Sequence, residues 1–233
     1  MYKMHNHWKF PEYEKRLLQV NEEGESTYTG LNTILKAGLP QVKKRDVVID
    51  VGANVGLVTV PLASRFSKVY AFECIPETFE CLQYNTRHLE NVECLQFAVS
   101  DHTGFIEAAR PVQDGVINSS GWATISSERI AMWEAEGIDA GKVKVNTLML
   151  DDMDFESVDF IKIDVEQAEM AVIKGAFKTI MKHLPVIEFE NKRRENHHVI
   201  EFLLGHGYQL LPGRSTKKAE CIMMPVPVEK ETC

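Results

Sequence analysis

The stretch that most constrains the fold of this chain is RDVVIDVGANVG, residues 45–56, where an apolar run leads into a glycine-spaced turn. Residues 47–49 are β-branched and continuous, as a strand buried on both faces requires. Asp50 follows where that strand would end. Gly52 and Gly56 allow the backbone to turn sharply and to approach a ligand without a Cβ in the way. The pattern therefore predicts a nucleotide-binding strand, loop and helix.

The glycine spacing separates two kinds of cofactor. Residues 55–66 have helical spacing of apolar residues, and the start of such a helix offers free N–H groups to an anionic group. A dinucleotide fold has G-x-G-x-x-G, whereas this chain has Asp-x-Gly-x-x-x-Gly. The carboxylate would repel a pyrophosphate but accept a hydrogen bond from an ammonium, which favours the amino acid end of S-adenosylmethionine. A structural turn in another α/β protein is the alternative. The expected cofactor contacts in this loop are Asp50, Gly52, Asn54 and Gly56.

The length and charge of the chain exclude several classes of protein. Its 233 residues, 44% of them hydrophobic, suffice for one well-buried α/β domain. The formal net charge of -8 argues against a general nucleic-acid surface, and we interpret the basic run at 192–194 as a solvated helix start. Five cysteines without a C-x-x-C pair indicate reduced thiols. The absence of an apolar leader and of a membrane-length apolar stretch predicts a cytoplasmic protein.

Short strands then alternate with helices. Residues 68–72 predict a strand, 77–89 a helix and 92–99 a third strand, which is typical of a doubly wound parallel sheet. Apolar residues at helical spacing within 1–45 predict a helical lid or, equally, a packing extension. We expect the main domain to cover residues 46–233.

Three polar residues follow the second and third of these strands. Glu73 stands just past the second, at the distance from the glycine loop where a carboxylate accepts hydrogen bonds from both ribose hydroxyls. Ser100 and Asp101 end the third, and ligands in open α/β sheets bind at such ends. Asp101 is therefore a candidate for the exocyclic amine of adenine, with an ordinary turn residue as the alternative.

Residues 104–146 interrupt the alternation with a polar, turn-rich stretch and a short helix around Met132 and Trp133. An insertion at this point would lie over the crevice and help to build a substrate pocket. Near the other end of the chain, 205–226 predicts an antiparallel hairpin appended to the sheet, because a short loop joins its two strands.

Acidic residues gather in the second half of the chain. Residues 160–163 predict a strand that ends at Asp164. Glu166 and Glu169 follow in the first turns of a helix expected over 165–180, where the macrodipole favours acids without a catalytic role. Asp164 differs because it lies at the strand end facing the crevice. It is the candidate for a catalytic residue.

A further strand within 184–191 ends with Glu190 and Asn191. Together with Asp164 these residues place oxygen ligands on neighbouring strand ends, a set that suits a hard cation such as Mg²⁺. Local hydrogen bonding by the same oxygens is the alternative.

Taken together, these motifs resemble the FkbM family of S-adenosylmethionine-dependent methyltransferases over residues 45–211. The resemblance rests on a combination of segments: DVGANVG at 50–56, AFE at 71–73, AVSD at 98–101, TLMLDD at 147–152 and DFIKIDVEQAEMAVIKGA at 159–176. It implies a Rossmann-like class I methyltransferase fold with a mostly parallel seven-stranded sheet and an antiparallel last strand. It also implies O-methylation of a sugar or natural-product hydroxyl, and it supports Asp50, Gly52, Gly56 and Glu73 as cofactor contacts.

One position departs from the family pattern. Members usually have glycine within an Asp-Val-Glu-Gly-Ala-Glu motif, and this chain has Gln167. In the similar metal-dependent catechol and macrolide-sugar O-methyltransferases, a general base commonly stands three residues after the strand-end aspartate, which is the place of Gln167. An amide cannot take a proton near neutrality. Either another group deprotonates the hydroxyl, or a metal lowers its pKa, or the acceptor is not an alcohol.

The sequence thus predicts an S-adenosylmethionine-dependent methyltransferase that acts on a hydroxyl of a small molecule, without a nucleic-acid or membrane partner. Two other classes remain as alternatives. The first is an NAD-dependent oxidoreductase on a related sheet, which the missing third glycine disfavours. The second is a non-catalytic cofactor-binding module, which Gln167 makes conceivable.

Overall fold

A computed structural model describes residues 2–14, 19–113, 116–117, 120–191, 196–212 and 220–227. Its strands are β1 (Tyr2–His5), β2 (Trp8–Pro11), β3 (Val47–Val51), β4 (Lys68–Phe72), β5 (Val92–Leu95), β6 (Ala98–Val99), β7 (Gly104–Gln113), β8 (Val116–Ile117), β9 (Asp139–Leu148), β10 (Phe160–Ile163), β11 (Val186–Glu190), β12 (Tyr208–Leu210) and β13 (Glu220–Pro225). Its α-helices are α1 (Thr29–Thr33), α2 (Thr59–Ala63), α3 (Pro76–Thr86), α4 (Ser127–Ala135), α5 (Glu169–Gly175), α6 (Phe177–His183) and α7 (His197–Leu204). A π-helix (Ile34–Gly38) and 3₁₀ turns (Leu39–Gln41, Ser120–Trp122 and Leu150–Asp152) complete the elements.

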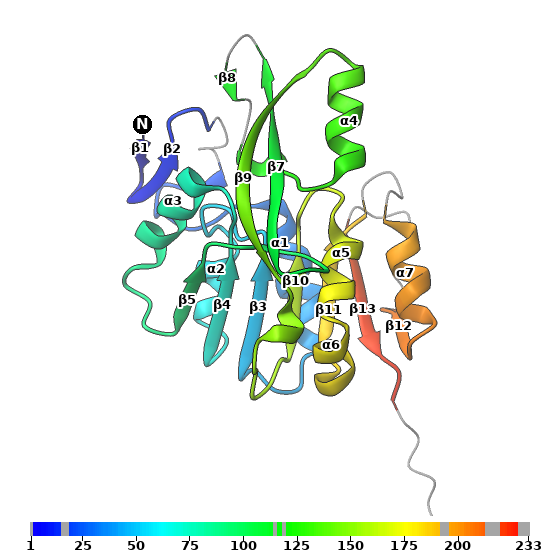
Figure 1. Cartoon of the computed structure of the whole chain (residues 1–233). Helices are drawn as coiled ribbons and strands as arrows, with labels where there is room; N and C mark the ends of the chain where they lie inside the picture. The colour runs from blue at the N-terminus through cyan, green and yellow to red at the C-terminus, as the bar shows by residue number, and fades with distance from the viewer. Residues whose placement is uncertain are drawn as a thin grey trace, which may run out of the picture.

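A seven-stranded sheet in the order β12-β13-β11-β10-β3-β4-β5 forms the centre of the molecule (Figure 1). β3 pairs in parallel with β4 and β10, and β5 and β11 extend the parallel set on either side. β13 pairs antiparallel with β11 and β12. The predicted mostly parallel sheet with an antiparallel last strand is confirmed. This order brings the carboxyl ends of the parallel strands to one edge, where ligands bind in such folds.

Both faces of the central sheet are covered, which explains why its strands are mostly apolar, with Asp50, Lys162 and Glu188 as buried exceptions. One face carries α5, α6 and α7, with Ile161 and Ile187 in the cluster beneath them. The other face carries α2 and residues 34–39, which pack on Val48 and Phe160. The strand predictions at 47–49, 68–72 and 160–163 are confirmed, because mostly apolar runs are characteristic of strands buried on both sides.

The N-terminal segment differs from the expected helical lid. Residues 2–11 form a β-hairpin whose turn residues, Asn6 and His7, have φ values of 44° and 72°. Positive φ at both central residues is the requirement of a tight hairpin turn, but Asn-His lacks the glycine that usually signals one. Trp8 and Phe10 of this hairpin pack with Cys81 of α3. The first α-helix of the described ranges is α1, and together with the π-helix and the 3₁₀ turn after it this helical part covers the apolar residues at helical spacing.

Two predicted elements are shorter than expected. Residues 55–58 form turns instead of the start of a helix, and α2 spans only Thr59–Ala63. The glycine loop therefore does not lead directly into a helix start. The third predicted strand, 92–99, is divided between β5 in the central sheet and β6, which pairs with β9. The chain changes sheets at Gln96 and Phe97.

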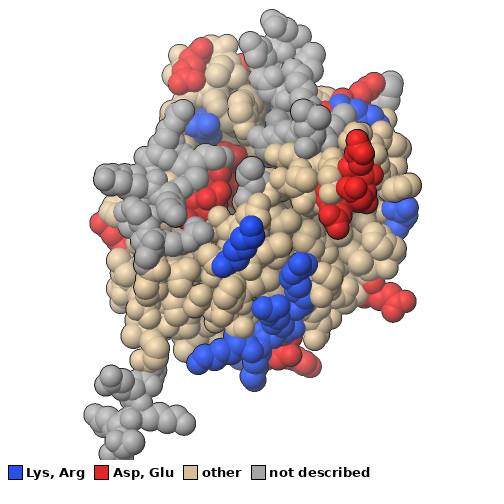
Figure 2. Space-filling model, turned by 180° about the vertical axis from the view of Figure 1, so that it is seen from behind, with Lys and Arg blue, Asp and Glu red and all other residues tan. Residues whose placement is uncertain are grey.

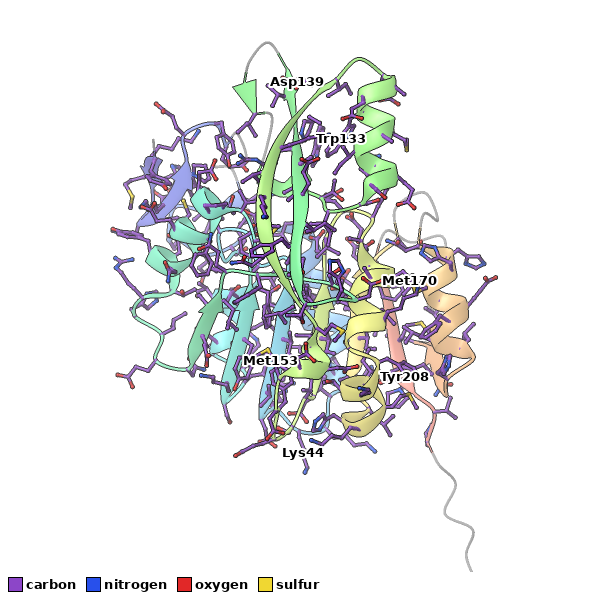
Figure 3. The ribbon with its side chains drawn as sticks, viewed as in Figure 1. Lys44, Trp133, Asp139, Met153, Met170 and Tyr208 are labelled. Atoms are coloured by element: carbon purple, nitrogen blue, oxygen red, sulfur yellow. The ribbon has the colours of Figure 1, made fainter. Side chains whose placement is uncertain are left out.

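Within the stretch expected to be a turn-rich insertion, β7 and β9 form most of a second sheet, and α4 lies where the short helix was expected. The sheet has the order β6-β9-β7-β8, and β7 and β9 pair from Gly104↔Thr147 to Val112↔Asp139. These strands rise above the central sheet with α4 beside them (Figure 1). Trp133 of α4 is buried against Ala109 of β7 (Figure 3). Alanines and Pro111 within β7 conceal its alternation from a pattern search.

The membrane-spanning potential, the surface charge and the cysteines can be compared with the sequence predictions. No helix in the described ranges is long and apolar enough to cross a bilayer. Positive side chains gather toward the lower part of the back face (Figure 2), and Lys44 lies at that end in Figure 3. Cys74, Cys81, Cys94 and Cys221 are free thiols. Cys233 and the basic run at 192–194 lie outside the described residues.

Candidate functional site

A cavity of about 300 Å³ lies where the carboxyl ends of β3, β4, β10 and β11 meet. The N-terminal segment, the second sheet and the loops after these strands all contribute to its wall. Its lining includes Phe10, Glu14, Gln19, Tyr28, residues 51–55, Glu73, Cys74, residues 97–99, Gly121, residues 123–125, Lys162, residues 164–166, Glu190 and Glu220.

The glycine loop brings β3 against the end of β10. Gly52 has a φ of +74°, and a Cβ there would lie 2.0 Å from the carbonyl oxygen of Asp164. Only glycine fits this position, because both the backbone conformation and the space exclude a side chain. Asn54 has a φ of 52° and also lines the cavity. Gly56 instead packs toward Leu82 and is not among the lining residues.

Asp50 does not line the cavity, although the sequence predicts a cofactor contact there. Its side chain is fully buried, its Oδ2 accepts a hydrogen bond from the Thr59 hydroxyl at 2.7 Å, and its Oδ1 lies 3.1 Å from the Lys162 ammonium. The ammonium group that this carboxylate meets therefore belongs to the protein. Asp50 supports the glycine loop from beneath.

Glu73 lies at the end of β4, lines the cavity and is held by backbone groups. Its Oε2 accepts a hydrogen bond from the N–H of Asn54 at 3.0 Å, and its Oε1 accepts one from the N–H of Ile75 at 2.9 Å. Burial raises the pKa of Glu73 to about 7, although these two N–H groups act in the opposite direction. Each oxygen keeps a lone pair for a further donor.

Lys162 is the centre of a buried row of ionisable side chains that crosses three strands. In the sheet register it stands beside Asp50 of β3 and Glu188 of β11. Its Nζ donates to the carbonyl oxygen of Gly52 at 2.9 Å and lies 3.9 Å from Asp164 Oδ2. Burial alone would lower the pKa of Lys162, but Asp50 and Asp164 outweigh it and hold the pKa above its usual value. Among the described residues that line the cavity, Lys162 alone is positively charged.

Asp164 lines the cavity and is oriented from two sides. Its side chain is 25% exposed, and its Oδ2 accepts a hydrogen bond from the Tyr28 hydroxyl at 3.1 Å. The Asp164 carboxylate raises the pKa of the Tyr28 phenol above its ordinary value, and burial adds to the effect. A Cβ on Gly30 would lie 2.5 Å from the Tyr28 ring, so this glycine lets the ring fold back over the site. Sequence reasoning missed Tyr28 and Lys162, because neither belongs to a local motif.

The loop after β10 adopts an unusual conformation. Glu166 and Gln167 have φ values of 49° and 74°, so the expected helix over 165–180 starts only at Glu169 and is interrupted between α5 and α6. Glu166 consequently faces the cavity instead of occupying a first helical turn. The Thr124 hydroxyl donates to the Glu166 carbonyl oxygen at 2.5 Å.

The three predicted metal ligands do not come together. Asn191 is buried, its Oδ1 accepts the N–H of Asn196 at 2.9 Å, and it is not among the residues that line the cavity. Asp164 and Glu190 do approach each other, with Glu166 as the third acid, and one oxygen from each lies within 4.8 Å of the others. The Lys162 ammonium beside Asp164 opposes a second cation there.

Ser100 and Asp101 lie away from the cavity. The preceding residues Ala98 and Val99 line it, but Ser100 and Asp101 do not. A Cβ on Gly175 would meet the Ser100 carbonyl oxygen at 1.8 Å, which places Ser100 beneath the end of α5. Asp101 is exposed and pairs with His102 at 3.1 Å. Asp101 therefore does not occupy the position expected for an adenine contact, because β6 turns into the second sheet.

A family model described as the Methyltransferase FkbM domain matches residues 50–210. Among solved structures, a methyltransferase FkbM from Methylobacillus flagellatus KT superposes with a TM-score of 0.58 at 16% identity, over 83% of this chain and 47% of that chain. The ribosomal protein L11 methylase from Lactobacillus delbrueckii subsp. bulgaricus superposes with a TM-score of 0.50 at 12% identity, over 89% and 88%. At these identities the two structures establish a shared fold.

A curated relative is similar over a short segment. The probable ribosomal RNA small subunit methyltransferase A of Pyrococcus furiosus is 43% identical over 56 residues, which is 24% of this chain and 20% of that protein. The chain therefore matches about a fifth of this relative and about half of the Methylobacillus protein.

Proposed function

Because the chain belongs to the FkbM methyltransferase family, we propose that it transfers the methyl group of S-adenosylmethionine to a hydroxyl of a sugar or another small metabolite. The observation that carries the proposal is Glu73. Its carboxylate lines the cavity, is oriented by two backbone N–H groups and retains acceptor capacity for the two hydroxyls of a ribose. Cys74 and residues 97–99 supply the adjoining wall for an adenine ring.

The remaining walls accommodate the other end of the cofactor and the acceptor. Gly52 and Asn54 bring the loop backbone to the cavity, while Asp50 and Gly56 support that loop from behind. Asp164 accepts a hydrogen bond from the acceptor hydroxyl, aligns its oxygen for attack and takes its proton, while the O–CH₃ bond forms, the S–CH₃ bond breaks and S-adenosylhomocysteine leaves. The Tyr28 hydroxyl and the Lys162 ammonium fix the direction of this carboxylate.

The bound cofactor supplies a methyl group already activated by positively charged sulfur. The protein therefore needs mainly to orient the nucleophile and to exclude water. Gln167 does not act as a base here, because its amide cannot take a proton. The proposed metal set does not fit, since Asn191 is committed to Asn196 and an ammonium stands beside Asp164, so we derive no step through a cation.

Two titrations test the cofactor assignment. Calorimetry with S-adenosylhomocysteine should show binding to the full chain, and the same measurement with NAD should show none. Binding of NAD in preference to S-adenosylhomocysteine would overturn the proposal in favour of an oxidoreductase.

Asp164→Asn tests the catalytic assignment, because it keeps the size of the side chain and removes its charge. Transfer of a labelled methyl group from S-adenosylmethionine into the small-molecule fraction of a cell extract should be abolished, while affinity for S-adenosylhomocysteine is largely retained. Asp154→Asn is the matched control, since Asp154 is exposed and ten positions upstream. Unchanged transfer by Asp164→Asn would reject the role of Asp164.

A further inference from the structure

The loop that follows β10 is held in a conformation that its own residues disfavour. Glu166 and Gln167 are consecutive and both lie in the left-handed region, with φ values of 49° and 74°. Residues with a Cβ rarely adopt this conformation, and such strain persists only where the surroundings impose it. Asp164, Val165 and Glu166 line the cavity from this loop. The conformation therefore determines part of the cavity wall.

One restraint on this loop comes from the second sheet. Thr124 is 2% exposed, and its hydroxyl donates to the Glu166 carbonyl oxygen at 2.5 Å. The same oxygen of Thr124 accepts the N–H of Ser126 at 3.0 Å, which fixes the direction of the hydroxyl hydrogen. The Thr124 backbone forms a two-way bridge with Ala109 of β7, at 2.9 and 3.0 Å. Thr124 is thus held by the second sheet through its backbone, and its hydroxyl bonds to the loop that follows β10 of the central sheet.

The loop after β10 also contacts the glycine loop at Gly52. A Cβ on Gly52 would lie 2.0 Å from the Asp164 carbonyl oxygen. A change of backbone direction after Asp164 would therefore displace the backbone of Gly52. We propose that Thr124 is a positioning residue, through which the second sheet keeps the loop after β10 in the form that completes the cofactor cavity. The inference rests on the proposed function, because it takes this cavity to be the cofactor site.

The test exploits the conformational freedom of glycine. Thr124→Val keeps the shape of the side chain and removes the donor, whereas Thr124→Ser keeps the donor. Gln167→Gly lets position 167 adopt a positive φ without strain and so makes the loop less dependent on Thr124. The four proteins to compare with the wild type are Thr124→Val, Thr124→Ser, Gln167→Gly and the double variant Thr124→Val/Gln167→Gly. Thr103→Val serves as the control, because its hydroxyl bonds to exposed Asp152, away from the cavity lining.

Affinity for S-adenosylhomocysteine, measured by calorimetry, is the deciding quantity, and thermal unfolding is recorded beside it. We expect Thr124→Val to weaken binding roughly twofold to tenfold, as the loss of one net hydrogen bond implies. Thr124→Ser and Thr103→Val should bind as the wild type does. The double variant should recover the lost affinity, although the Ser126 N–H remains without its acceptor and the melting temperature stays low.

Each result bears on the inference differently. Unchanged affinity in Thr124→Val, even with a lower melting temperature, would show that the residue merely stabilises the fold and would overturn the proposal. Weakened affinity that Gln167→Gly does not restore would also overturn it, because the effect would not pass through the loop conformation. If the wild type itself binds no S-adenosylhomocysteine, the proposed function fails and this inference fails with it.

Discussion

The two walls of the cavity are built in different ways. On the β3–β4 side, the functional carboxylate of Glu73 is held by backbone N–H groups of Asn54 and Ile75, all within one short stretch of the chain. On the β10–β11 side, Asp164 is held by the side chains of Tyr28 and Lys162, and Tyr28 is 136 positions away in the sequence. The first wall is thus encoded by a local motif, and the second by contacts between distant segments.

The walls also differ in how they handle charge. Glu73 faces no cation within ion-pair distance among the described residues, and burial keeps part of its population protonated near neutral pH. Lys162 instead stays charged because it pairs with a fully buried aspartate. Removing Lys162 should therefore disturb folding above all, whereas removing the charge of Glu73 should disturb binding.

The largest effect is expected from Lys162→Met. It leaves Asp50 buried without its cation, and breaking such a pair from one side costs about 3–5 kcal/mol. Urea unfolding of the full chain measures this loss. Adding Asp50→Asn in the same chain should recover part of it, because the stranded charge is then removed.

Lys142→Met is the matched control for that measurement. Lys142 pairs with Glu107 and Glu134 on the surface of the second sheet, where solvent screens the charges. The urea midpoint of the Lys142→Met variant should barely differ from that of the wild type. If the two lysine variants behaved alike, the buried row would have no special role in stability.

The β3–β4 wall should respond to pH. The pKa of Glu73 is raised from 4.5 to about 7, so the folded state holds the proton more tightly and loses stability as pH rises between these values. Affinity for S-adenosylhomocysteine should move in the opposite sense and increase from about pH 6 to about pH 8, because the ionised form accepts hydrogen bonds from both ribose hydroxyls. Calorimetry across this range checks the expected rise.

Glu73→Gln sharpens the same point. It should weaken S-adenosylhomocysteine binding about tenfold to a hundredfold, as the loss of charge-assisted hydrogen bonds implies. It should also remove the pH dependence of binding. A variant that retained the rise with pH would place the titrating group elsewhere, with Glu169 the next candidate, since burial raises its pKa to about 7 as well.

The smallest effect is expected from Tyr28→Phe, which removes only the hydroxyl that donates to Asp164 within the β10–β11 wall. A stability loss of about 1 kcal/mol follows from one net hydrogen bond, measured by urea unfolding. Tyr84→Phe is the control, because the Tyr84 hydroxyl makes no hydrogen bond within the described part of the chain. Equal losses in both variants would show that the contact to Asp164 contributes nothing.

The same contrast explains what could be predicted from the sequence. Glu73, Gly52 and the parallel strands follow from motifs in which neighbouring residues carry all the information. Asp50 was assigned to the ligand because its true partner, Lys162, lies in another strand and becomes visible only through the sheet register. The position of Asp101 differs from the expectation because the two-residue strand β6 leaves the central sheet, and a single polar residue, Gln96, is the only sign of this in the apolar pattern of 94–99. The hairpin at residues 2–11 escaped notice because its turn lacks glycine.

The contribution of Tyr28 has a practical consequence for expressing only the part of the chain that the family model matches. Phe10, Glu14, Gln19 and Tyr28 precede residue 50, where the family match begins, and Glu220 follows residue 210, where it stops. A gene fragment limited to the match would also lack Ile34 and Leu39, whose loss bares an apolar sheet surface and invites aggregation. The matched range 50–210 is therefore shorter than the range that must be expressed to obtain all the residues that line the cavity.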